Sequence, residues 1–556
     1  MRLSTSVARI ATAAAILFAT NVHALQKVTR AGRYLYTDDG NRFYIKGVAY
    51  QPQGVTSTDP NNPFPEPSSF TDPLADSAGC ARDIPFLQQL SVNAIRVYSV
   101  NSSLNHDSCM QALSAAGIYT ILDLSIPLNG SIDRSNPAWT TNLLDLYLTT
   151  IDVFSKYDNM LAYNIGNEVI VDSNGTAAAP YIKAAARDVK AYLTSKNFQG
   201  LVGYAAIDQS PDLLIPLANY LSCDANTDSI DLFGLNNYEW CGDDTFAAAY
   251  ANIEGAFAGY NVAAYFSEFG CITQPPRLWT EVQALFSDQM SPVWSGGLAF
   301  SYFPAESGQG EFGMVTISGN TVTPNADFTR LVAQYGNITA PNTPSKSDAG
   351  AGTYPSCPAA NSTWLASTTL PPTPDDTACA CAVNNLSCQF TPQTTNTTAI
   401  VGQLIDAACG SLGGAGGNCN DIGGSGSAGT YGRFSYCDPN SKLSFIMTEF
   451  YEATSRNAQS CNFAGNATIN KNAPSSVSAV NAAVSQCLSK SQGTFTPSAP
   501  GTPAATGGSG GGGGGSGSSS TPKSSSAALG RAGFEGAFGI GAMLVAAVVG
   551  GVWTLA

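Results

Sequence analysis

Two glutamates, Glu168 and Glu268, stand at or near the ends of apolar, β-prone runs, YNIGNEVI at 163–170 and YFSEFGC at 265–271. Burying a carboxylate at the end of such a run is costly unless the charge is paired or used in chemistry. Two carboxyl groups can cleave a glycosidic bond, since one protonates the leaving oxygen while the other attacks or stabilises the sugar carbon. The pair therefore predicts a site for glycosidic-bond chemistry. The alternative is that each glutamate caps a helix or forms a structural salt bridge.

The low histidine content limits the other kinds of catalytic site that the chain could form. The sequence has two histidines, His23 and His106, and His23 falls in an N-terminal segment that resembles a signal peptide. A Ser-His-Asp site would have to use His106, and no G-x-S-x-G elbow between a strand and a helix is present. A histidine-rich zinc site cannot be built, and no C-x-x-C pair is present. Carboxylate chemistry remains, and the sequence indicates neither a metal nor a cofactor.

The stretch from 25 to 340 has the pattern of strands that alternate with helices. Helix-like segments occur between several of the strands, for example at 180–196 and 277–290. Continuous apolar strands separated by helices indicate parallel βα units, and eight of them in about 300 residues predict an α/β fold of the (β/α)8, TIM-barrel type. The eight β-prone runs are FYIKGVAY (43–50), AIRVYS (94–99), YTILDLS (119–125), LAYNIGNE (161–168), LVGYAA (201–206), SIDLFGLNNY (229–238), VAAYFSEFG (262–270) and LAFSYF (298–303).

Such a barrel would bring the two glutamates together. Catalytic groups of (β/α)8 barrels lie at the C-terminal ends of the strands. Glu168 ends the fourth predicted strand and Glu268 lies near the end of the seventh. These strand ends face each other across a barrel mouth, so the predicted fold supports the interpretation of the glutamates as a pair.

Beyond residue 340 the composition changes. Residues 341–378 are rich in Pro, Ser and Thr, and we expect them to form a connector. Residues 379–487 hold eight of the fourteen cysteines, which predicts a compact, disulfide-rich module. Residues 488–526 are rich in Gly and Ser and cannot bury a core, so we expect a flexible stalk.

Both ends of the sequence carry targeting signals. Residues 1–24 combine positive charge, a short apolar core and a small-residue cleavage site, as in a secretory signal peptide. Residues 527–556 follow small residues near Ser526 and end in an apolar tail, which is the pattern of a GPI-anchor signal that is removed. The alternative is a transmembrane helix, but the tail has no basic stop sequence. Eight N-x-[ST] sequons fit a eukaryotic secretory pathway.

The charge content argues against a nucleic-acid partner. The formal net charge is −15, and only 12% of the residues are charged. Nucleic-acid binding requires clustered lysines and arginines. A neutral, hydroxyl-rich ligand is more compatible with this composition.

Six segments together resemble glycoside hydrolase family 72, the fungal cell-wall β-1,3-glucanosyltransferases: FYIKGVAYQ, NAIRVYSVN, YNIGNEV, FGLNNYEWCG, YFSEFGC and WSGGLAFSYF. The resemblance covers 25–487, and 379–487 is similar to a cysteine-rich module of one subgroup, related to carbohydrate-binding family 43. It implies a GPI-anchored (β/α)8 enzyme at the outer face of the plasma membrane and in the cell wall. Such an enzyme cleaves β-1,3-glucan internally and transfers the new reducing end to another glucan chain. Donor and acceptor are then both β-1,3-glucan, and we expect a monomer.

The resemblance also implies roles for single residues. Glu168 would be the acid/base and Glu268 the nucleophile. Asn167 would hydrogen-bond the sugar 2-hydroxyl, Tyr238 would orient the nucleophile, and Arg96 would pair with a catalytic carboxylate and keep it ionised. Core packing is the alternative for each tyrosine. Further substrate-binding candidates are Gln51, Tyr98, Asp123 and Tyr302.

The implied mechanism is a retaining double displacement, in which Glu268 is ionised and Glu168 has a raised pKa. One residue departs from the pattern: Phe312 stands where related proteins are expected to have a tyrosine, so a hydroxyl contact to the acceptor sugar would be missing. Two other functions fit parts of the sequence. One is a secreted endo-β-glucanase, and the other is a non-catalytic, wall-anchored glucan-binding protein.

Spacing alone leaves the cysteine connectivity undetermined. The resemblance implies three bridges in and around the barrel, Cys80–Cys109, Cys223–Cys357 and Cys241–Cys271. Within the cysteine-rich module the expected bridges are Cys379–Cys437, Cys381–Cys487, Cys388–Cys461 and Cys409–Cys419.

Overall fold

The computed structural model describes residues 25–54, 69–127, 130–489 and 497. The predicted signal peptide, the predicted anchor signal with Ser526, and nearly all of the predicted stalk lie outside the described residues.

Eight parallel strands close into a barrel, which confirms the predicted fold class. Nearly every strand residue is buried, because the barrel interior covers one face of each strand and the surrounding helices cover the other. Neighbours along the chain are also neighbours in the barrel, and the last strand pairs with the first. The barrel strands are β3 (Ile45–Ala49), β4 (Ala94–Val97), β5 (Tyr119–Asp123), β6 (Met160–Asn167), β7 (Leu201–Ile207), β8 (Leu232–Asn236), β9 (Ala263–Phe269) and β10 (Trp294–Ala299).

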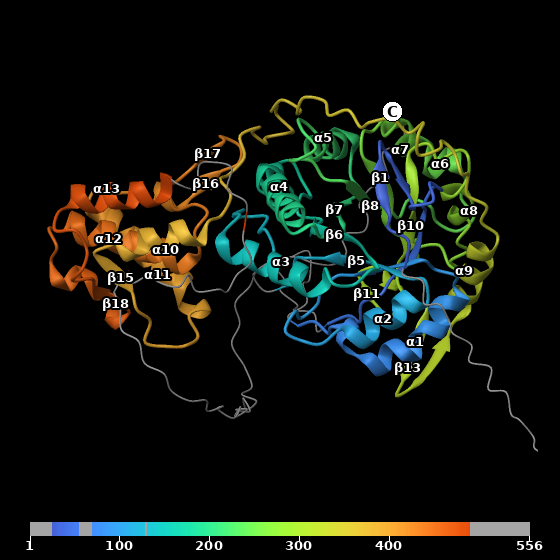
Figure 1. Ribbon diagram of the computed structural model, residues 1–556, viewed down its shortest axis with the longest axis horizontal. Coiled ribbons are helices and arrows are strands. Elements are labelled where there is room, and N and C mark those ends of the chain that lie inside the picture. The colour runs from blue at the N-terminus through green and yellow to red at the C-terminus, as the bar shows by residue number, and fades with distance from the viewer. Residues whose placement is uncertain (1–24, 55–68, 128–129, 490–496, 498–556) are drawn as a thin grey trace, which may run out of the picture.

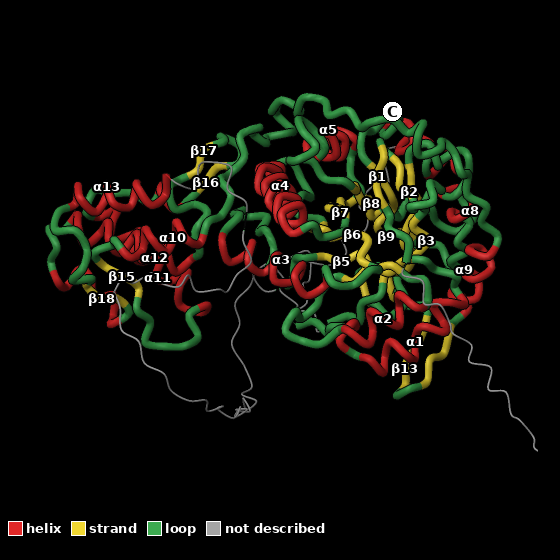
Figure 2. Tube along the Cα trace, in the orientation of Figure 1, coloured by secondary structure: helices red, strands yellow, loops and turns green. Residues whose placement is uncertain are grey.

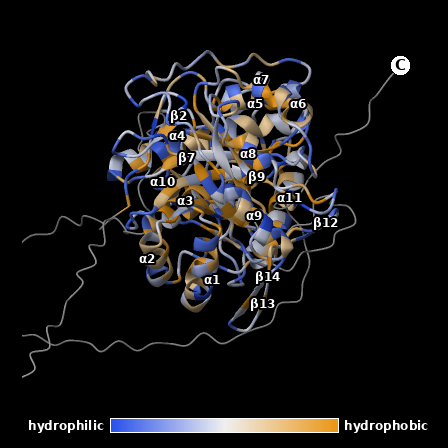
Figure 3. Ribbon diagram, turned by 90° about the vertical axis from the view of Figure 1, so that its right-hand side faces the viewer, coloured by the Kyte–Doolittle hydropathy of each residue, from blue (hydrophilic) through white to orange (hydrophobic). Residues whose placement is uncertain are grey.

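Helices surround these strands (Figures 1 and 2). In Figure 3, α1 and α2 show both hydrophobic and hydrophilic stretches, as expected of helices that bury one face against a core. The helices are α1 (Ser77–Gln89), α2 (Asp107–Ala115), α3 (Thr141–Phe154), α4 (Ala179–Lys196), α5 (Pro211–Leu221), α6 (Phe246–Ala249), α7 (Ala251–Ala256), α8 (Glu281–Leu285) and α9 (Ala326–Gly336), with 3-10 turns η1 (Pro73–Ala75) and η2 (Asn174–Ala178). Three hairpins are added, β1–β2 (Thr29–Ala31, Tyr34–Tyr36), β11–β12 (Glu306–Ser307, Gly310–Glu311) and β13–β14 (Val315–Ser318, Thr321–Pro324).

The last barrel strand begins earlier than the sequence predicts. The predicted run is 298–303, whereas β10 starts at Trp294. The Ser-Gly-Gly sequence inside β10 resembles a turn, but these glycines serve close packing. A Cβ atom on Gly296 would lie 2.2 Å from the carbonyl oxygen of Ile45 on β3. Glycine is therefore needed where the first and last strands meet.

The predicted helix at 277–290 is mostly absent. Only α8 within this range is an α-helix. Trp279 has a φ of +61°, a left-handed conformation that a right-handed helix cannot contain, so the helix can start only after this residue. The predicted helix at 180–196 is confirmed by α4.

A helical module follows the barrel in the chain. Seven disulfides connect the same pairs of cysteines as those expected from the resemblance. Four of the seven lie within this module. Its elements are α10 (Asp376–Asn384), α11 (Thr398–Gly414), α12 (Pro439–Ala453) and α13 (Val477–Leu488), the paired strands β15 (Cys388–Phe390) and β18 (Ala467–Ile469), the paired strands β16 (Gly424–Ser425) and β17 (Thr430–Tyr431), and 3-10 turns η3 (Asn420–Ile422), η4 (Ala458–Cys461) and η5 (Phe463–Gly465).

The module lies against the α3 and α4 side of the barrel (Figure 1). The β16–β17 hairpin contacts α4, where the rings of Tyr181 and Tyr431 meet edge to face with centroids 5.7 Å apart. The backbone N–H of Thr141, at the start of α3, donates to the carbonyl oxygen of Tyr436 at 2.9 Å. The linking segment, yellow in Figure 1, runs along the barrel and is attached to it by the Cys223–Cys357 bridge.

Within the described part of the chain, every helix is too short or too polar to cross a membrane.

The hairpin contact gives a first prediction. A Cβ atom on Gly426 would lie 1.9 Å from the carbonyl oxygen of Ala177 in η2. We expect Gly426→Ala to displace the hairpin from the barrel and to destabilise the protein by about 1–3 kcal/mol, as overpacking does. Thermal unfolding and limited proteolysis of the linking segment measure this effect.

Gly410 of the same module is the matched control. It is exposed on α11 and has no atom within 4 Å of its added Cβ, so Gly410→Ala should be neutral or stabilise the helix by about 0.5–1 kcal/mol. Equal melting temperatures for the two variants would show that close packing of the hairpin against η2 does not contribute to stability.

Candidate active site

A fully buried arginine joins the strand ends at the barrel mouth. Arg96 of β4 has 0% exposure, and Asp123 of β5 binds its guanidinium through two oxygens at 3.2 and 2.7 Å. Its Nη2 also donates to Oδ1 of Asn167 on β6 at 2.9 Å. Its Nη1 lies 3.3 Å from Oε1 of Glu268 on β9 and 3.4 Å from Oδ1 of Asn236 on β8. One cation therefore contacts the ends of four further strands.

Glu268 is buried and accepts hydrogen bonds at both carboxyl oxygens. The hydroxyl of Tyr98 donates to Oε1 at 2.8 Å, beside Arg96, and the hydroxyl of Tyr238 donates to Oε2 at 2.8 Å. Burial raises the pKa of both tyrosines well above the usual value, so their hydroxyls remain donors. The carboxyl group is held at one orientation by three side chains from two strand ends.

Burial raises the pKa of Glu268 to about 7, and the carboxylate of Glu168 adds to this rise, whereas Arg96 and the hydroxyls of Tyr238 and Tyr98 lower the pKa. Two neighbouring buried carboxylates do not ionise independently, so the proton belongs to the pair rather than to one residue. The mechanism implied by the sequence predicts a raised pKa for Glu168. The structure shows a raised pKa for Glu268, mainly because its carboxyl group is buried, and the raised pKa expected of Glu168 stays a prediction.

Glu168 follows the last residue of β6 and has 6% exposure. Nδ2 of Asn236 donates to its Oε1 at 2.7 Å. Asn236 is in turn held by the hydroxyl of Ser267, which donates to Oδ1 at 2.7 Å. The amide orientation of Asn236 is thus determined by its neighbours, and its N–H points to Glu168.

Several residues singled out from the sequence gather here. Besides the two glutamates they are Arg96, Tyr98, Asn167 and Tyr238, and each is linked to the others by the hydrogen bonds given above. Gln51 lies at the edge of this group. Its Oε1 accepts from the backbone N–H groups of Tyr98 and Ser99 at 3.2 and 3.1 Å, and its Nε2 donates to the carbonyl oxygen of Thr71 at 2.6 Å.

Two residues expected to contact sugar are placed elsewhere. Asp123 is fully buried and its carboxylate is used by Arg96 and by Nδ2 of Asn164 at 2.6 Å. Tyr302 has 0% exposure, and its hydroxyl donates to Asp83 of α1 at 3.1 Å. Asp123 therefore supports the site through Arg96, whereas Tyr302 is anchored to α1, and sugar contact by either residue stays a prediction.

Phe312 is also fully buried. Its ring packs against Tyr238 and Phe300, with centroids 5.5 and 5.2 Å away. Phe312 thus lies behind Tyr238 and supports the ring whose hydroxyl donates to Glu268.

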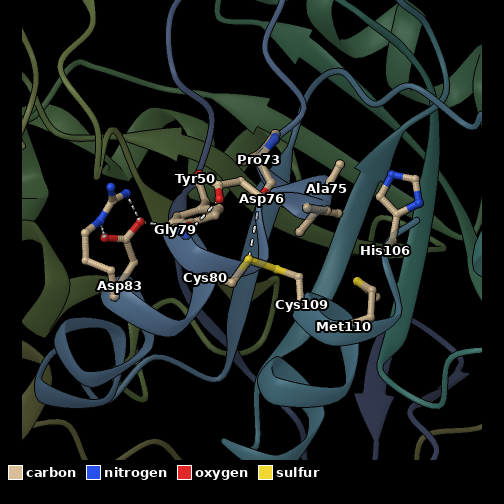
Figure 4. The surroundings of a disulfide bond; sticks show 12 residues. Tyr50, Pro73, Ala75, Asp76, Gly79, Cys80, Asp83, His106, Cys109 and Met110 are labelled. Carbon is tan, nitrogen blue, oxygen red and sulfur yellow. Dashed lines mark hydrogen bonds and ion pairs between the residues drawn. A yellow bond between two sulfur atoms is a disulfide. The ribbon is translucent and has the colours of Figure 1, made fainter. Parts of the chain in front are cut away.

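His106 has a structural environment. Its Nε2 lies 2.8 Å from Oδ2 of Asp72, and its ring contacts Phe154. It lies near the Cys80–Cys109 bridge, which ties α1 to α2 (Figure 4). A second bridge, Cys241–Cys271, connects the segments after β8 and β9 and so lies near Glu268 in the chain.

One group of possible metal ligands lies together among the described residues. It consists of Cys223, Asp224 and Cys357. The two sulfur atoms are joined in a disulfide and cannot bind a metal as thiolates.

Three residues of the site are not among those predicted from the sequence: Asn236, Ser267 and Asn164. All three are polar residues within predicted strands that are otherwise apolar, at FGLNNY, YFSEF and LAYNIG. A polar residue inside a buried strand must find a partner, so this pattern could have marked them.

The raised pKa of Glu268 predicts how stability depends on pH. A carboxyl group with a raised pKa in the folded state gives stability that is present below its unfolded pKa of 4.5 and lost as the pH rises through about 7. Glu268→Gln removes this loss. The free energy of unfolding of the variant, relative to that of the wild type, should therefore rise by on the order of 2 kcal/mol as the pH increases from about 4 to about 8.

Thermal unfolding of both proteins at the two pH values measures this gain. The control is Glu306→Gln, at an exposed glutamate of β11. Its difference in stability from the wild type should be the same at both pH values. The same constant difference for Glu268→Gln would contradict the assigned burial effect.

Comparisons with known proteins agree with this geometry. A sequence profile described as glucanosyltransferase matches residues 14–339, and one described as the X8 domain matches 386–468. The 1,3-beta-glucanosyltransferase gas1 of Schizosaccharomyces pombe is 40% identical over 79% of this chain and 78% of its own length. The 1,3-beta-glucanosyltransferase GAS2 of Saccharomyces cerevisiae is 37% identical over 77% of each chain.

Solved structures show the same likeness. The structure of Saccharomyces cerevisiae Gas2p in complex with laminaritriose and laminaritetraose matches with a TM-score of 0.71 and 35% identity, over 80% of this chain and 98% of that one. The profile match and these identities show the family. The protein belongs to the glucanosyltransferase family.

Proposed function

We propose that this protein is a retaining β-1,3-glucanosyltransferase, which cleaves β-1,3-glucan internally and transfers the new reducing end to another glucan chain. The observation that carries the proposal is the hydrogen-bonded group in which Arg96, Tyr98 and Tyr238 hold Glu268 while Asn236 holds Glu168. Family membership, the names of the relatives and the laminari-oligosaccharides bound by the solved relative support the choice of substrate.

In the first step, Glu268 attacks the anomeric carbon of the donor, and Glu168 gives its proton to the leaving glycosidic oxygen. The mechanism needs one proton on the pair, and repulsion between the two carboxylates favours this state. Three donors to Glu268 favour its ionised form, which leaves the proton to Glu168. Asn236 donates to Oε1 of Glu168 and so holds the carboxyl group at the barrel mouth.

In the second step, Glu168 acts as a base. It removes the proton from the hydroxyl of an acceptor sugar, whose oxygen attacks the glycosyl–Glu268 ester and restores the nucleophile. Asn167 supports both steps, since Arg96 and Asn236 hold its amide oxygen and orient its nitrogen toward the sugar 2-hydroxyl. Transfer to water in place of a sugar would be hydrolysis.

The proposal extends to the organisation of the whole chain. Residues 25–340 are the catalytic domain, 341–378 a connector tied back by Cys357, and 379–487 a glucan-binding-like module. Residues 1–24 and 527–556 are removed during secretion and anchoring, and 488–526 form the stalk. The mature protein is then attached by a GPI anchor near Ser526 to the outer face of the plasma membrane and acts on the cell wall.

Mass spectrometry of the products from one defined β-1,3-gluco-oligosaccharide tests the activity. We expect products both longer and shorter than the substrate, because transfer lengthens one chain at the expense of another. Shorter products alone would identify a hydrolase, and an unchanged substrate would contradict the proposal.

Variants test the two roles. Glu168→Gln and Glu268→Ala should each lower turnover of the oligosaccharide by about 10³-fold or more. Glu254→Gln changes a half-buried glutamate of α7 and should leave turnover unchanged. Substantial activity in either of the first two variants would contradict the assignment.

Ser267 gives a finer prediction. Its hydroxyl fixes the amide of Asn236, and Ser267→Ala should lower kcat/KM about tenfold, since a misplaced hydrogen bond costs on the order of 1–3 kcal/mol. Ser295 is the control, because its buried hydroxyl on β10 has no hydrogen-bond partner among the described residues. Similar kinetics for Ser267→Ala and Ser295→Ala would show that Asn236 does not depend on Ser267.

A further inference from the structure

Two consecutive residues at the end of β6 contact the same side chain. Nδ2 of Asn236 donates to Oδ1 of Asn167 at 3.2 Å and to Oε1 of Glu168 at 2.7 Å. Successive side chains of an extended strand point to opposite faces of the sheet. An extended β6 could therefore bring either Asn167 or Glu168 to Asn236, but not both.

The backbone at Glu168 resolves this conflict. Its φ is +49°, a left-handed conformation that costs free energy for any residue with a side chain. The register between β6 and β7 also shifts between Asn164 and Asn167. The strand thus ends in a left-handed turn, and this turn brings the carboxyl group of Glu168 to the same side as Asn167.

Strained backbone persists only where its surroundings hold it. The peptide groups on both sides of Glu168 are held. Its own N–H donates to the carbonyl oxygen of Ala205 on β7 at 2.8 Å. Its carbonyl oxygen accepts from Nε and Nη2 of Arg134 at 3.1 and 2.8 Å. The next N–H, that of Val169, donates to the hydroxyl oxygen of Tyr204 at 3.0 Å.

Arg134 and Tyr204 approach the turn from the two neighbours of β6. Arg134 lies in the segment between β5 and α3, and Tyr204 lies on β7. Tyr204 is fully buried and fits closely, because a Cβ atom on Gly166 would lie 3.3 Å from its ring. The guanidinium uses two donors on one carbonyl oxygen, an arrangement that the single ammonium of lysine does not reproduce.

We propose that Arg134 and Tyr204 are positioning residues that hold the left-handed turn and thereby aim the carboxyl group of Glu168 into the barrel mouth. The inference rests on the acid/base role proposed for Glu168. Without these contacts the turn relaxes toward extended backbone, and the carboxyl group of Glu168 leaves Asn236. Donor cleavage then loses proton transfer to the leaving oxygen, while attack by Glu268 is unaffected.

The leaving group of the donor tests this inference. A sugar leaving group needs the proton from Glu168, whereas fluoride leaves with little help from an acid. The test compares kcat/KM, which reports donor cleavage, for a β-1,3-gluco-oligosaccharide and for β-laminaripentaosyl fluoride, with the full-length protein. For Arg134→Ala we expect kcat/KM to fall about 10–100-fold with the oligosaccharide. With the fluoride, kcat/KM should change by less than about threefold.

Three further variants sharpen the comparison. Arg134→Lys retains charge but loses the paired donors and should show an intermediate loss with the same preference for the fluoride. Tyr204→Phe removes the acceptor for Val169 and should show this preference too. Arg42 is the matched control, since its buried guanidinium also donates to backbone carbonyl oxygens, those of Thr343 and Ser291, but at the start of β3. Arg42→Ala should affect both donors equally.

The outcomes separate this inference from the proposed function. Equal losses with both donors for the Arg134 and Tyr204 variants, or no loss, would overturn the positioning role. Glu168→Gln provides the reference and should show the largest preference for the fluoride. If Glu168→Gln showed no such preference, the acid/base assignment itself would be wrong. If Arg134→Ala does not fold, Arg134→Lys and Tyr204→Phe still give either result.

Discussion

The site depends on one buried positive charge. A guanidinium without solvent exposure is tolerated only when its charge is paired and its N–H groups are hydrogen-bonded. Arg96 meets this condition with Asp123, Asn167, Asn236 and Glu268, which lie on four other strands. Removing the arginine would leave two buried carboxylates without their cation. The requirement to satisfy this charge therefore fixes the relative positions of the strand ends on which the two glutamates stand.

The sequence predicts the parts of this arrangement that follow from periodicity. Eight apolar runs separated by helices specify a barrel, and a charged residue at a strand end marks the mouth. Periodicity does not specify the direction of a side chain at a strand end. Asp123 lies at the end of β5 but points to Arg96, and Tyr302 points to Asp83 of α1. The residue types of Asp123 and Tyr302 suggested a role near the site, but the partners of their side chains depend on the tertiary structure.

Other residues of the site were missed because their contacts span long stretches of sequence. Asn236 meets Glu168 across 68 positions, and Arg134 meets the same residue across 34. Neither contact leaves a local pattern. The left-handed backbone at Glu168 is equally hidden, because glutamate does not favour this conformation and nothing in YNIGNEV indicates it. Only the folded structure shows this unfavourable backbone conformation, and it marks Glu168 as a position where neighbouring residues hold the chain.

The two glutamates are held in different ways, and the difference matches what the proposed mechanism asks of each. Glu268 is fixed through its carboxyl oxygens by a cation and two hydroxyls, which favour the ionised form that a nucleophile needs. Glu168 must gain and lose a proton in every cycle. Supports that depend on its charge would weaken in one of its two states. Contacts to its backbone from Arg134 and Ala205 do not use the carboxyl oxygens, so they can hold the acid and the base in one position.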